Sequence, residues 1–218
     1  MYPKGPKEGK GMAHVLIITG GGAPRSIEVI DLGEYDMVIA ADSGIEAAER
    51  YGLAVDLWVG DFDSVSIKPT FTGETVYRDH RVKLESDTEL ALQAALERKM
   101  TSYTLLGGGG YRFDHLLVTY ALFEKYGVPT AWHTKYESMY SVTSHRTIER
   151  RAGQTVSILP AYGSGKSIVT APNLRWPLRE YPLTHASISL SNEMIEKPLT
   201  VQVSGDPIFI CFPVADLL

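Results

Sequence analysis

Cysteine is nearly absent from this sequence, because Cys211 is the only one among its 218 residues. A single thiol cannot form a disulfide within the chain, which predicts a protein of a reducing compartment. Cys211 stands in the apolar run 208–212. We therefore expect it to be a small buried hydrophobic residue rather than a nucleophile.

Long apolar stretches are also missing. No run approaches the roughly 18 residues that span a bilayer. Residues 1–11 are rich in Lys, Gly and Pro and lack the apolar core of a signal peptide. We expect these residues to form a flexible leader and the protein to be cytoplasmic.

An excess of positive charge is lacking as well. The formal net charge is −5, so the chain has no overall basic field that would attract nucleic acid or an anionic membrane. We expect its partners to be small molecules, with neither nucleic acid nor membrane among them. A local cationic pocket remains compatible with this charge.

Two familiar nucleotide-binding signatures are absent. Glycine turns occur at 20–22 and 107–110, but neither ends in the Gly-Lys-Ser/Thr of a Walker A loop. Neither turn has the spacing of the dinucleotide-binding fingerprint, so NAD use is not expected.

Short apolar segments alternate with helical segments in the first part of the chain. These segments show no polar alternation, which is typical of strands in a parallel sheet covered on both faces. We expect strands at 15–19, 37–41, 57–59, 75–77 and 103–106, and helices at 45–51, 87–99 and 113–126. The alternation predicts an α/β domain over residues 12–135.

The character of the chain changes near residue 135. Beyond it, short β-rich runs are separated by Gly and Pro, and no convincing helix is found. The expected strands are 140–142, 155–159, 168–169, 187–190, 199–203 and 208–212. We predict a small all-β sandwich or barrel over residues 136–218.

Four aspartates share one kind of position, at the end of a predicted strand or the start of a predicted helix: Asp42, Asp61, Asp87 and Asp114. Ligands of open α/β sheets bind beyond the carboxyl ends of the strands. Carboxylates that converge there need a cation, and oxygen ligands favour a hard ion such as Mg²⁺. In an extended segment Asp61 and Asp63 point the same way and can hold one ion, with Phe62 turned into the core. A surface turn that caps a helix is the alternative.

A second candidate segment, Arg112-Phe113-Asp114-His115, follows the glycine turn 107–110. Backbone N–H groups of such a turn can hold a phosphate, and the guanidinium of Arg112 can contact phosphate oxygens with two donors. A solvated Arg112 next to a capped helix is the alternative explanation.

The order and spacing of these segments are more specific than any one of them. They are Ala41-Asp42-Ser43-Gly44, Val59-Gly60-Asp61-Phe62-Asp63-Ser64, Ser86-Asp87-Thr88-Glu89 and Gly110-Tyr111-Arg112-Phe113-Asp114-His115, followed by Leu174-Arg175-Trp176-Pro177-Leu178 and Ser189-Leu190-Ser191-Asn192-Glu193. Together they resemble the thiamine pyrophosphokinase family over nearly the whole chain after Met12.

The resemblance implies transfer of the pyrophosphoryl group of ATP to the hydroxyl of thiamine, which gives thiamine diphosphate and AMP. It implies a nucleotide-binding catalytic domain followed by a thiamine-binding domain, Mg²⁺ as cofactor, and a homodimer. The implied catalytic residues are Asp61, Asp63, Asp87 and Arg112, and the first three also hold the metal. The implied ATP-binding residues are Asp42, Ser43, Gly44, Gly60, Ser64, Arg112, Asp114 and His115. The implied thiamine-binding residues are Trp176, Ser191 and Asn192.

Three positions depart from the family pattern. Leu84 stands where the family has an Asp, Tyr111 where it has a second Gly, and Thr119 where it commonly has Asn. A related pyrophosphokinase that acts on another alcohol, such as a pterin or a thiamine analogue, therefore stays open. So do a non-catalytic nucleotide sensor and a sugar-nucleotide transferase that uses Asp61 and Asp63.

Overall fold

The computed structural model describes residues 13–28, 30–65, 71–79, 81, 84–109, 112–162 and 165–214. The expected leader at 1–11 and the motif residues Gly110 and Tyr111 lie outside the described residues. The chain divides into two compact units, one formed by Met1–Thr119 with Pro129–Lys135 and the other by Tyr120–Val128 with Tyr136–Leu218.

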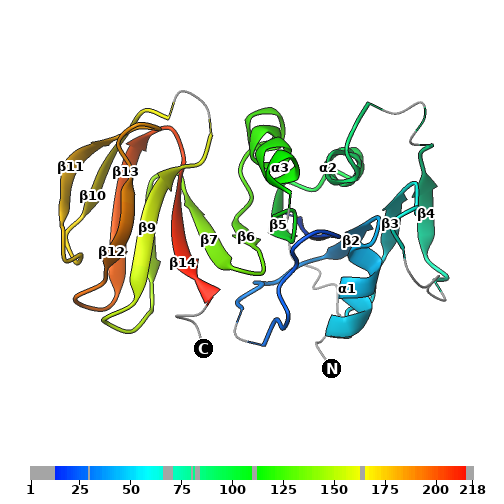
Figure 1. The fold of residues 1–218 in the computed structure, drawn as a ribbon, viewed down its shortest axis with the longest axis horizontal. Helices are drawn as coiled ribbons and strands as arrows, with labels where there is room; N and C mark the ends of the chain where they lie inside the picture. The colour runs from blue at the N-terminus through cyan, green and yellow to red at the C-terminus, as the bar shows by residue number, and fades with distance from the viewer. Residues whose placement is uncertain are drawn as a thin grey trace. The chain divides into compact units, whose positions relative to one another are not determined.

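The first unit contains a sheet of parallel strands in the order β6-β5-β1-β2-β3-β4 (Figure 1). The strands are β1 (His14–Thr19), β2 (Met37–Ala41), β3 (Leu57–Gly60), β4 (Glu74–Tyr77), β5 (Ser102–Leu106) and β6 (Ala131–His133). The central strands β1, β2, β3 and β5 are almost entirely buried, which explains their lack of polar alternation. The predicted α/β class is confirmed.

Helices α1 (Gly44–Tyr51) and α2 (Asp87–Glu97) lie on opposite sides of this sheet (Figure 1). Helix α1 approaches β1 closely, because a Cβ added to Gly44 would lie 2.1 Å from the carbonyl oxygen of Ile18. It ends at Gly52, whose φ of 68° is the left-handed conformation that glycine adopts without strain. Helix α2 begins as predicted, with Ser86 Oγ accepting a hydrogen bond from the backbone N–H of Glu89 at 3.2 Å.

Helix α3 (Phe113–Tyr126) has the bounds that the sequence predicts. Its residues are divided between the two units, since the division falls after Thr119. Gly127 follows the helix with a φ of 81°.

Besides part of α3, the second unit contains antiparallel strands in the orders β12-β9-β14-β7 and β11-β10-β13-β8. Its strands are β7 (Glu137–Val142), β8 (His145–Ile148), β9 (Thr155–Pro160), β10 (Ser167–Ala171), β11 (Leu178–Leu183), β12 (Ser189–Glu193), β13 (Leu199–Gly205) and β14 (Ile208–Pro213). The all-β prediction for this part of the chain is confirmed.

Three of the described strands, β6, β8 and β11, were not expected from the sequence. β8 and β11 are edge strands with mostly exposed side chains, and β11 contains Pro182, so neither has the apolar pattern of a central strand. β6 has only three residues, too few for a recognisable pattern.

Cys211 is buried in β14, as predicted. Burial, together with the nearby Glu137 carboxylate, raises the pKa of its thiol to about 12. The thiol is therefore protonated and unreactive at neutral pH.

Within the described ranges, no helix combines the length and the apolar character needed to cross a membrane.

Candidate active site

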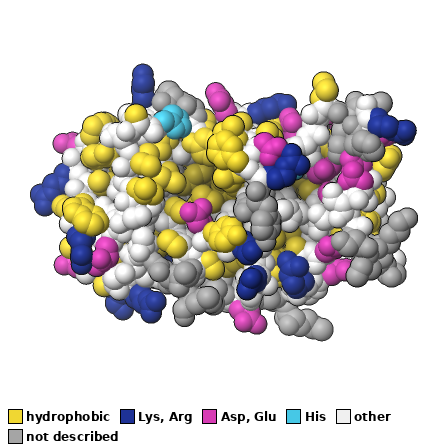
Figure 2. Space-filling model, in the orientation of Figure 1, with side chains coloured by type: hydrophobic (Ala, Val, Ile, Leu, Met, Phe, Trp, Pro, Cys, Tyr) yellow, Lys and Arg dark blue, Asp and Glu magenta, His cyan; other side chains and the backbone are white. Residues whose placement is uncertain are grey.

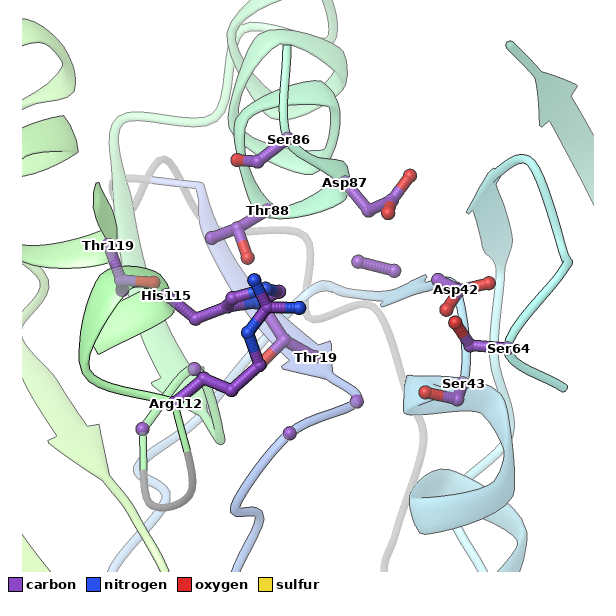
Figure 3. A pocket seen from close by; sticks show the side chains of 15 residues that line it. Thr19, Asp42, Ser43, Ser64, Ser86, Asp87, Thr88, Arg112, His115 and Thr119 are labelled. Atoms are coloured by element: carbon purple, nitrogen blue, oxygen red, sulfur yellow. The ribbon is translucent and has the colours of Figure 1, made fainter. Parts of the chain in front are cut away.

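A cleft of about 350 Å³ opens in the α/β unit. It is lined by Thr19, Gly20, Gly21, Ala41, Asp42, Ser43, Ser64, Ser86, Asp87, Thr88, Gly108, Gly109, Arg112, His115 and Thr119 (Figure 3). These residues lie at or after the carboxyl ends of β1, β2, β3 and β5, or at the start and in the first two turns of α2 and α3.

The topology of the sheet explains the position of this cleft. The chain runs from β1 through β2 and β3 to β4 on one side, and returns to place β5 on the other side of β1. The loops after β1 and β5 therefore leave in opposite directions and open a crevice between them.

One wall of the cleft is acidic, because Asp42 and Asp87 line it. Ligand oxygens of Asp42, Asp61 and Asp63 all lie within 4.8 Å of one another. Asp42 follows β2, and the other two belong to the turn after β3. Figure 2 shows Asp and Glu side chains gathered over the part of this unit where α2 and β3 lie.

Asp42 is the buried member of this group, with 8% of its surface exposed. Its Oδ1 atom is buried without a hydrogen-bond partner. Burial raises the pKa of this carboxyl, and the nearby charges of Asp87 and Asp61 raise it further, against hydrogen bonds from Ser43 and Ser64. A buried, unpartnered carboxylate oxygen beside two further carboxylates fits a divalent cation, because a hard cation prefers oxygen ligands and would compensate their charge.

Asp87 is not in this close group, but it lies beside it. A Cβ added to Gly60 would meet Asp87 Oδ1 at 3.2 Å and the Cβ of Asp42 at 3.3 Å. The missing side chain of Gly60 thus lets the two carboxylates approach from α2 and from β2.

The turn that carries Asp61 and Asp63 differs from the extended segment that the sequence predicts. Phe62 has a φ of 63°, a conformation rare for a bulky residue. Its ring still packs against the core, at 4.0 Å between ring centroids from Trp58. Asp63 donates its backbone N–H to Asp61 Oδ1 at 3.3 Å, so the two carboxylates are held in one compact turn.

The opposite wall carries a cation. Arg112 lies across the cleft from Asp42, Ser43 and Ser64 (Figure 3). Its Nε and Nη2 donate to the two carboxylate oxygens of Asp114, at 3.1 and 2.5 Å. This fork lowers the pKa of Asp114 to about 2, with a further contribution from the backbone N–H of His115.

The floor between the walls is glycine-rich. Gly108 has a φ of 74°, and a Cβ there would lie 3.2 Å from the Thr119 methyl group. At Gly20 the space is smaller, because a Cβ would lie 2.1 Å from Ser43 Oγ. Such turns expose backbone N–H groups to an anionic ligand.

The three residues expected to bind thiamine lie in the β unit. Trp176 is 60% exposed, and the side-chain amide of Asn192 holds its backbone. Trp176 N donates to Asn192 Oδ1 at 3.1 Å, and Asn192 Nδ2 donates to the Trp176 carbonyl at 2.8 Å. Ser191 is exposed in a bulge of β12, where its φ is 51° and its N–H donates to Ser157 Oγ.

The structure brings most of the expected nucleotide-site residues together. Asp42, Ser43, Ser64, Asp87, Arg112 and His115 line the cleft. Gly44, Gly60, Asp61, Asp63 and Asp114 do not line it. Asp61 and Asp63 lie beside Asp42, within 4.8 Å between ligand oxygens, and Asp114 accepts hydrogen bonds from Arg112. Sequence reasoning did not assign to the site the lining residues Thr19, Gly20, Gly21, Ala41, Ser86, Thr88, Gly108, Gly109 and Thr119. Gly108 and Gly109 belong to the glycine turn 107–110, which was expected to be able to hold a phosphate.

The fold and the site define an α/β protein with an acidic, glycine-floored cleft, joined in one chain to an all-β unit. Residues 32–131 match the family model described as "Thiamin pyrophosphokinase, catalytic domain", and residues 145–207 match "Thiamin pyrophosphokinase, vitamin B1 binding domain". The chain belongs to the thiamin pyrophosphokinase family.

Solved structures share the fold. A thiamin pyrophosphokinase family protein from Enterococcus faecalis is 24% identical with a TM-score of 0.72, over 92% of this chain and 99% of that one. Thiamine pyrophosphokinase from Bacillus subtilis is 21% identical with a TM-score of 0.72, over 92% and 98%. Thiamin pyrophosphokinase from Candida albicans is 16% identical with a TM-score of 0.69, over 92% and 89%. At these identities the likeness shows the fold alone. No curated protein sequence matches the chain.

Proposed function

We propose that this protein transfers the pyrophosphoryl group of ATP to the hydroxyl of thiamine, producing thiamine diphosphate and AMP. The observation that carries the proposal is the cleft, in which Asp42 lies across a glycine floor from Arg112 and is joined by Asp61 and Asp63 in a group of three carboxylates. The match of residues 145–207 to a vitamin B1-binding domain supports thiamine as the acceptor.

ATP would lie in this cleft with its phosphates over the glycine turns. The backbone N–H groups near Gly20 and Gly108 and the hydroxyl of Ser43 can donate to phosphate oxygens. In the reaction the thiamine oxygen bonds to the β-phosphorus while the bond from that phosphorus to the AMP oxygen breaks. The thiamine hydroxyl loses its proton to a carboxylate or to water.

Asp42, Asp61 and Asp63 would hold Mg²⁺, with Asp87 beside them. When bound, the ion would neutralise phosphate charge and so favour attack by an oxygen nucleophile. The buried, unpartnered Oδ1 of Asp42 supports this assignment, and it adds Asp42 to the predicted ligands Asp61, Asp63 and Asp87.

Arg112 would move from Asp114 to the transferred phosphates. Both partners are exposed, with 67% and 61% of their side-chain surface accessible, so solvent already screens their ion pair. A phosphate carries more charge than a carboxylate and offers the same paired geometry to the guanidinium. The ion pair with Asp114 would thus hold the Arg112 side chain at the cleft until the substrate binds.

Trp176 would present its indole face to thiamine, whose thiazolium is cationic and whose pyrimidine is flat. Asn192 would orient this tryptophan, because both atoms of its amide hold the Trp176 backbone. Ser191 would contribute polar contacts at the same edge. We further propose that the protein acts as a homodimer in the cytoplasm.

The direct test combines the protein with ATP, Mg²⁺ and thiamine and measures AMP. Release of AMP that requires thiamine supports the proposal, whereas ADP release or thiamine-independent hydrolysis contradicts it. A pterin alcohol and a thiamine analogue in place of thiamine test the acceptor.

The Trp176→Ala variant should raise the KM for thiamine while leaving the KM for ATP within about twofold. Sedimentation analysis at enzyme-assay concentrations tests the dimer.

A further inference from the structure

The three grouped carboxylates, Asp42, Asp61 and Asp63, come from two separate turns. Asp42 follows β2, whereas Asp61 and Asp63 belong to the turn after β3. Like charges within 4.8 Å repel one another, so before a cation binds the two turns need other contacts to keep them together.

Both turns also have unusual backbone conformations. Asp42 has a φ of 47° and Phe62, between the other two carboxylates, has a φ of 63°. Left-handed conformations of non-glycine residues persist where surrounding contacts hold them. The contacts around these two residues therefore decide whether the carboxylates converge.

Trp58 contacts both of these residues. It lies on β3 and is 8% exposed. Its indole Nε1 donates to the carbonyl of Asp42 at 2.9 Å. The same carbonyl also accepts a hydrogen bond from the backbone N–H of Ile45, at 3.3 Å. The hydrogen bond from the indole is therefore the shorter of the two that this carbonyl accepts.

The ring of Trp58 packs against the second turn. Its centroid lies 4.0 Å from that of Phe62, with 34° between the ring planes. Phe62 also contacts Tyr77, at 5.9 Å between centroids. One side chain thus holds the Asp42 carbonyl by its N–H group and the Asp61–Asp63 turn by its ring face.

We propose that Trp58 is a positioning residue for the divalent-cation site, which it assembles by linking the turn of Asp42 to the turn of Asp61 and Asp63. This inference rests on the proposed function only in assuming that the acidic group binds a cation. Trp58 itself does not line the cleft.

Two tryptophans of the α/β unit make the same kind of bond, which provides a matched control. Trp132 is 2% exposed, and its Nε1 donates to the carbonyl of Gly107 at 2.6 Å, beside the glycine turn rather than the carboxylates. Trp58→Phe and Trp132→Phe each remove one buried indole N–H and keep an aromatic ring. A general loss of packing would affect the two variants alike.

The experiment measures Mn²⁺ binding to the metal-free protein, with free Mn²⁺ followed by electron paramagnetic resonance and thermal unfolding recorded in parallel. Trp58→Phe should raise the Kd for Mn²⁺ by about 3- to 10-fold, the effect of losing one hydrogen bond, and raise the Mg²⁺ concentration needed for half-maximal activity similarly. Trp132→Phe should leave the Kd for Mn²⁺ within about twofold. An unchanged Kd in Trp58→Phe overturns the proposal.

A second pair of variants tests the ring contact and serves if Trp58→Phe does not fold. Phe62→Leu removes the ring that stacks on Trp58, whereas Phe71→Leu removes an edge contact to the same tryptophan at 5.9 Å, outside the acidic turn. Phe62→Leu should weaken Mn²⁺ binding and Phe71→Leu should not. Equal Kd values for these two variants contradict the positioning role. If the wild-type protein binds no Mn²⁺, the metal assignment itself fails, and this inference with it.

Discussion

The hydroxyl of Ser43 occupies the space in which a side chain of Gly20 would begin, 2.1 Å from a Cβ built on that glycine. Gly20 follows β1 and Ser43 follows β2, and both line the cleft. The absence of a side chain at Gly20 therefore leaves room for the Ser43 hydroxyl in the cleft.

Gly20→Ala should displace this hydroxyl and weaken ATP binding. Ser43 can change its rotamer, so the fold should tolerate the new methyl group with little loss of stability. The displaced hydroxyl can no longer donate to a phosphate, and we expect the KM for ATP to rise by about 3- to 10-fold. Steady-state kinetics with varied ATP and a thermal unfolding curve measure the two effects.

Gly21→Ala is the matched control, because a Cβ there meets no atom within 4 Å. It should leave the KM for ATP within about twofold. Gly20→Ala and Ser43→Ala act on the same hydroxyl, so the double variant should be no worse than either single one. Additive losses in the double variant would show that Gly20 acts by another route.

Arg112→Ala should slow the reaction at saturating substrate. Its guanidinium faces the acidic wall across the cleft, where charge on the transferred group would need a cationic partner. We expect kcat to fall by about 100- to 1,000-fold, which is typical of removing one preorganised charge-stabilising group. The measurement is the initial rate of AMP release.

Arg81 provides the control for this substitution, because it makes the same fork to an aspartate two residues away. Its Nε and Nη2 donate to Asp79, and its side chain is 76% exposed outside the cleft. Exposed pairs of this kind contribute about 0–1 kcal/mol to stability. Arg81→Ala should leave kcat within about twofold, and a loss equal to that of Arg112→Ala would mean that Arg112 has no special role.

Asp42→Asn should stabilise the metal-free protein while removing cation binding. The variant removes a buried negative charge that lies close to Asp61 and Asp87, and asparagine tolerates the left-handed conformation of this position. We expect the Tm in EDTA to rise by roughly 2–4 °C, the equivalent of about 1 kcal/mol for a chain of this size. Mn²⁺ binding should fall by at least about tenfold.

Asp63→Asn separates the two effects, because Asp63 is the exposed member of the group. It should weaken Mn²⁺ binding without raising the Tm in EDTA. A rise of Tm in both variants would attribute the stabilisation to overall charge rather than to the burial of Asp42.

Local signals explain which parts of the fold could be predicted. The capping box of Ser86 and Glu89 and the helix-ending Gly127 act over a few residues, so α2 and α3 begin and end near their predicted bounds. The strands with continuous burial could be predicted for the same reason, because a run of apolar residues is also a local signal. The edge strands β8 and β11 were missed because most of their side chains are exposed, and β8 in addition pairs with β13, which is far away in the sequence.

The site was predictable as a set of segments but not as a geometry. Spacing identified Asp61 and Asp63, and the order of the segments added Asp87 and Arg112. Nothing local to the sequence shows that Asp42, rather than Asp87, completes the close carboxylate group. That depends on the pairing of β2 with β3 and on the left-handed backbone of Phe62, whose ring packs on Trp58.

His14 should make the stability of the protein depend on pH. Its ring nitrogens lie 2.8 Å from Ser102 Oγ and 3.0 Å from Thr104 Oγ1, and burial lowers its pKa more than the charge of Asp36 raises it. The folded protein therefore resists a proton that the unfolded chain accepts below about pH 6.5, so stability present above that pH is lost as the pH falls. His14→Asn cannot take up this proton, so its Tm should fall less than that of the wild type between about pH 7.5 and about pH 5, a range that brackets the ordinary pKa of histidine. His145→Asn, at an exposed position of β8, should keep the wild-type slope, and equal slopes for wild type and His14→Asn would exclude His14 as the source.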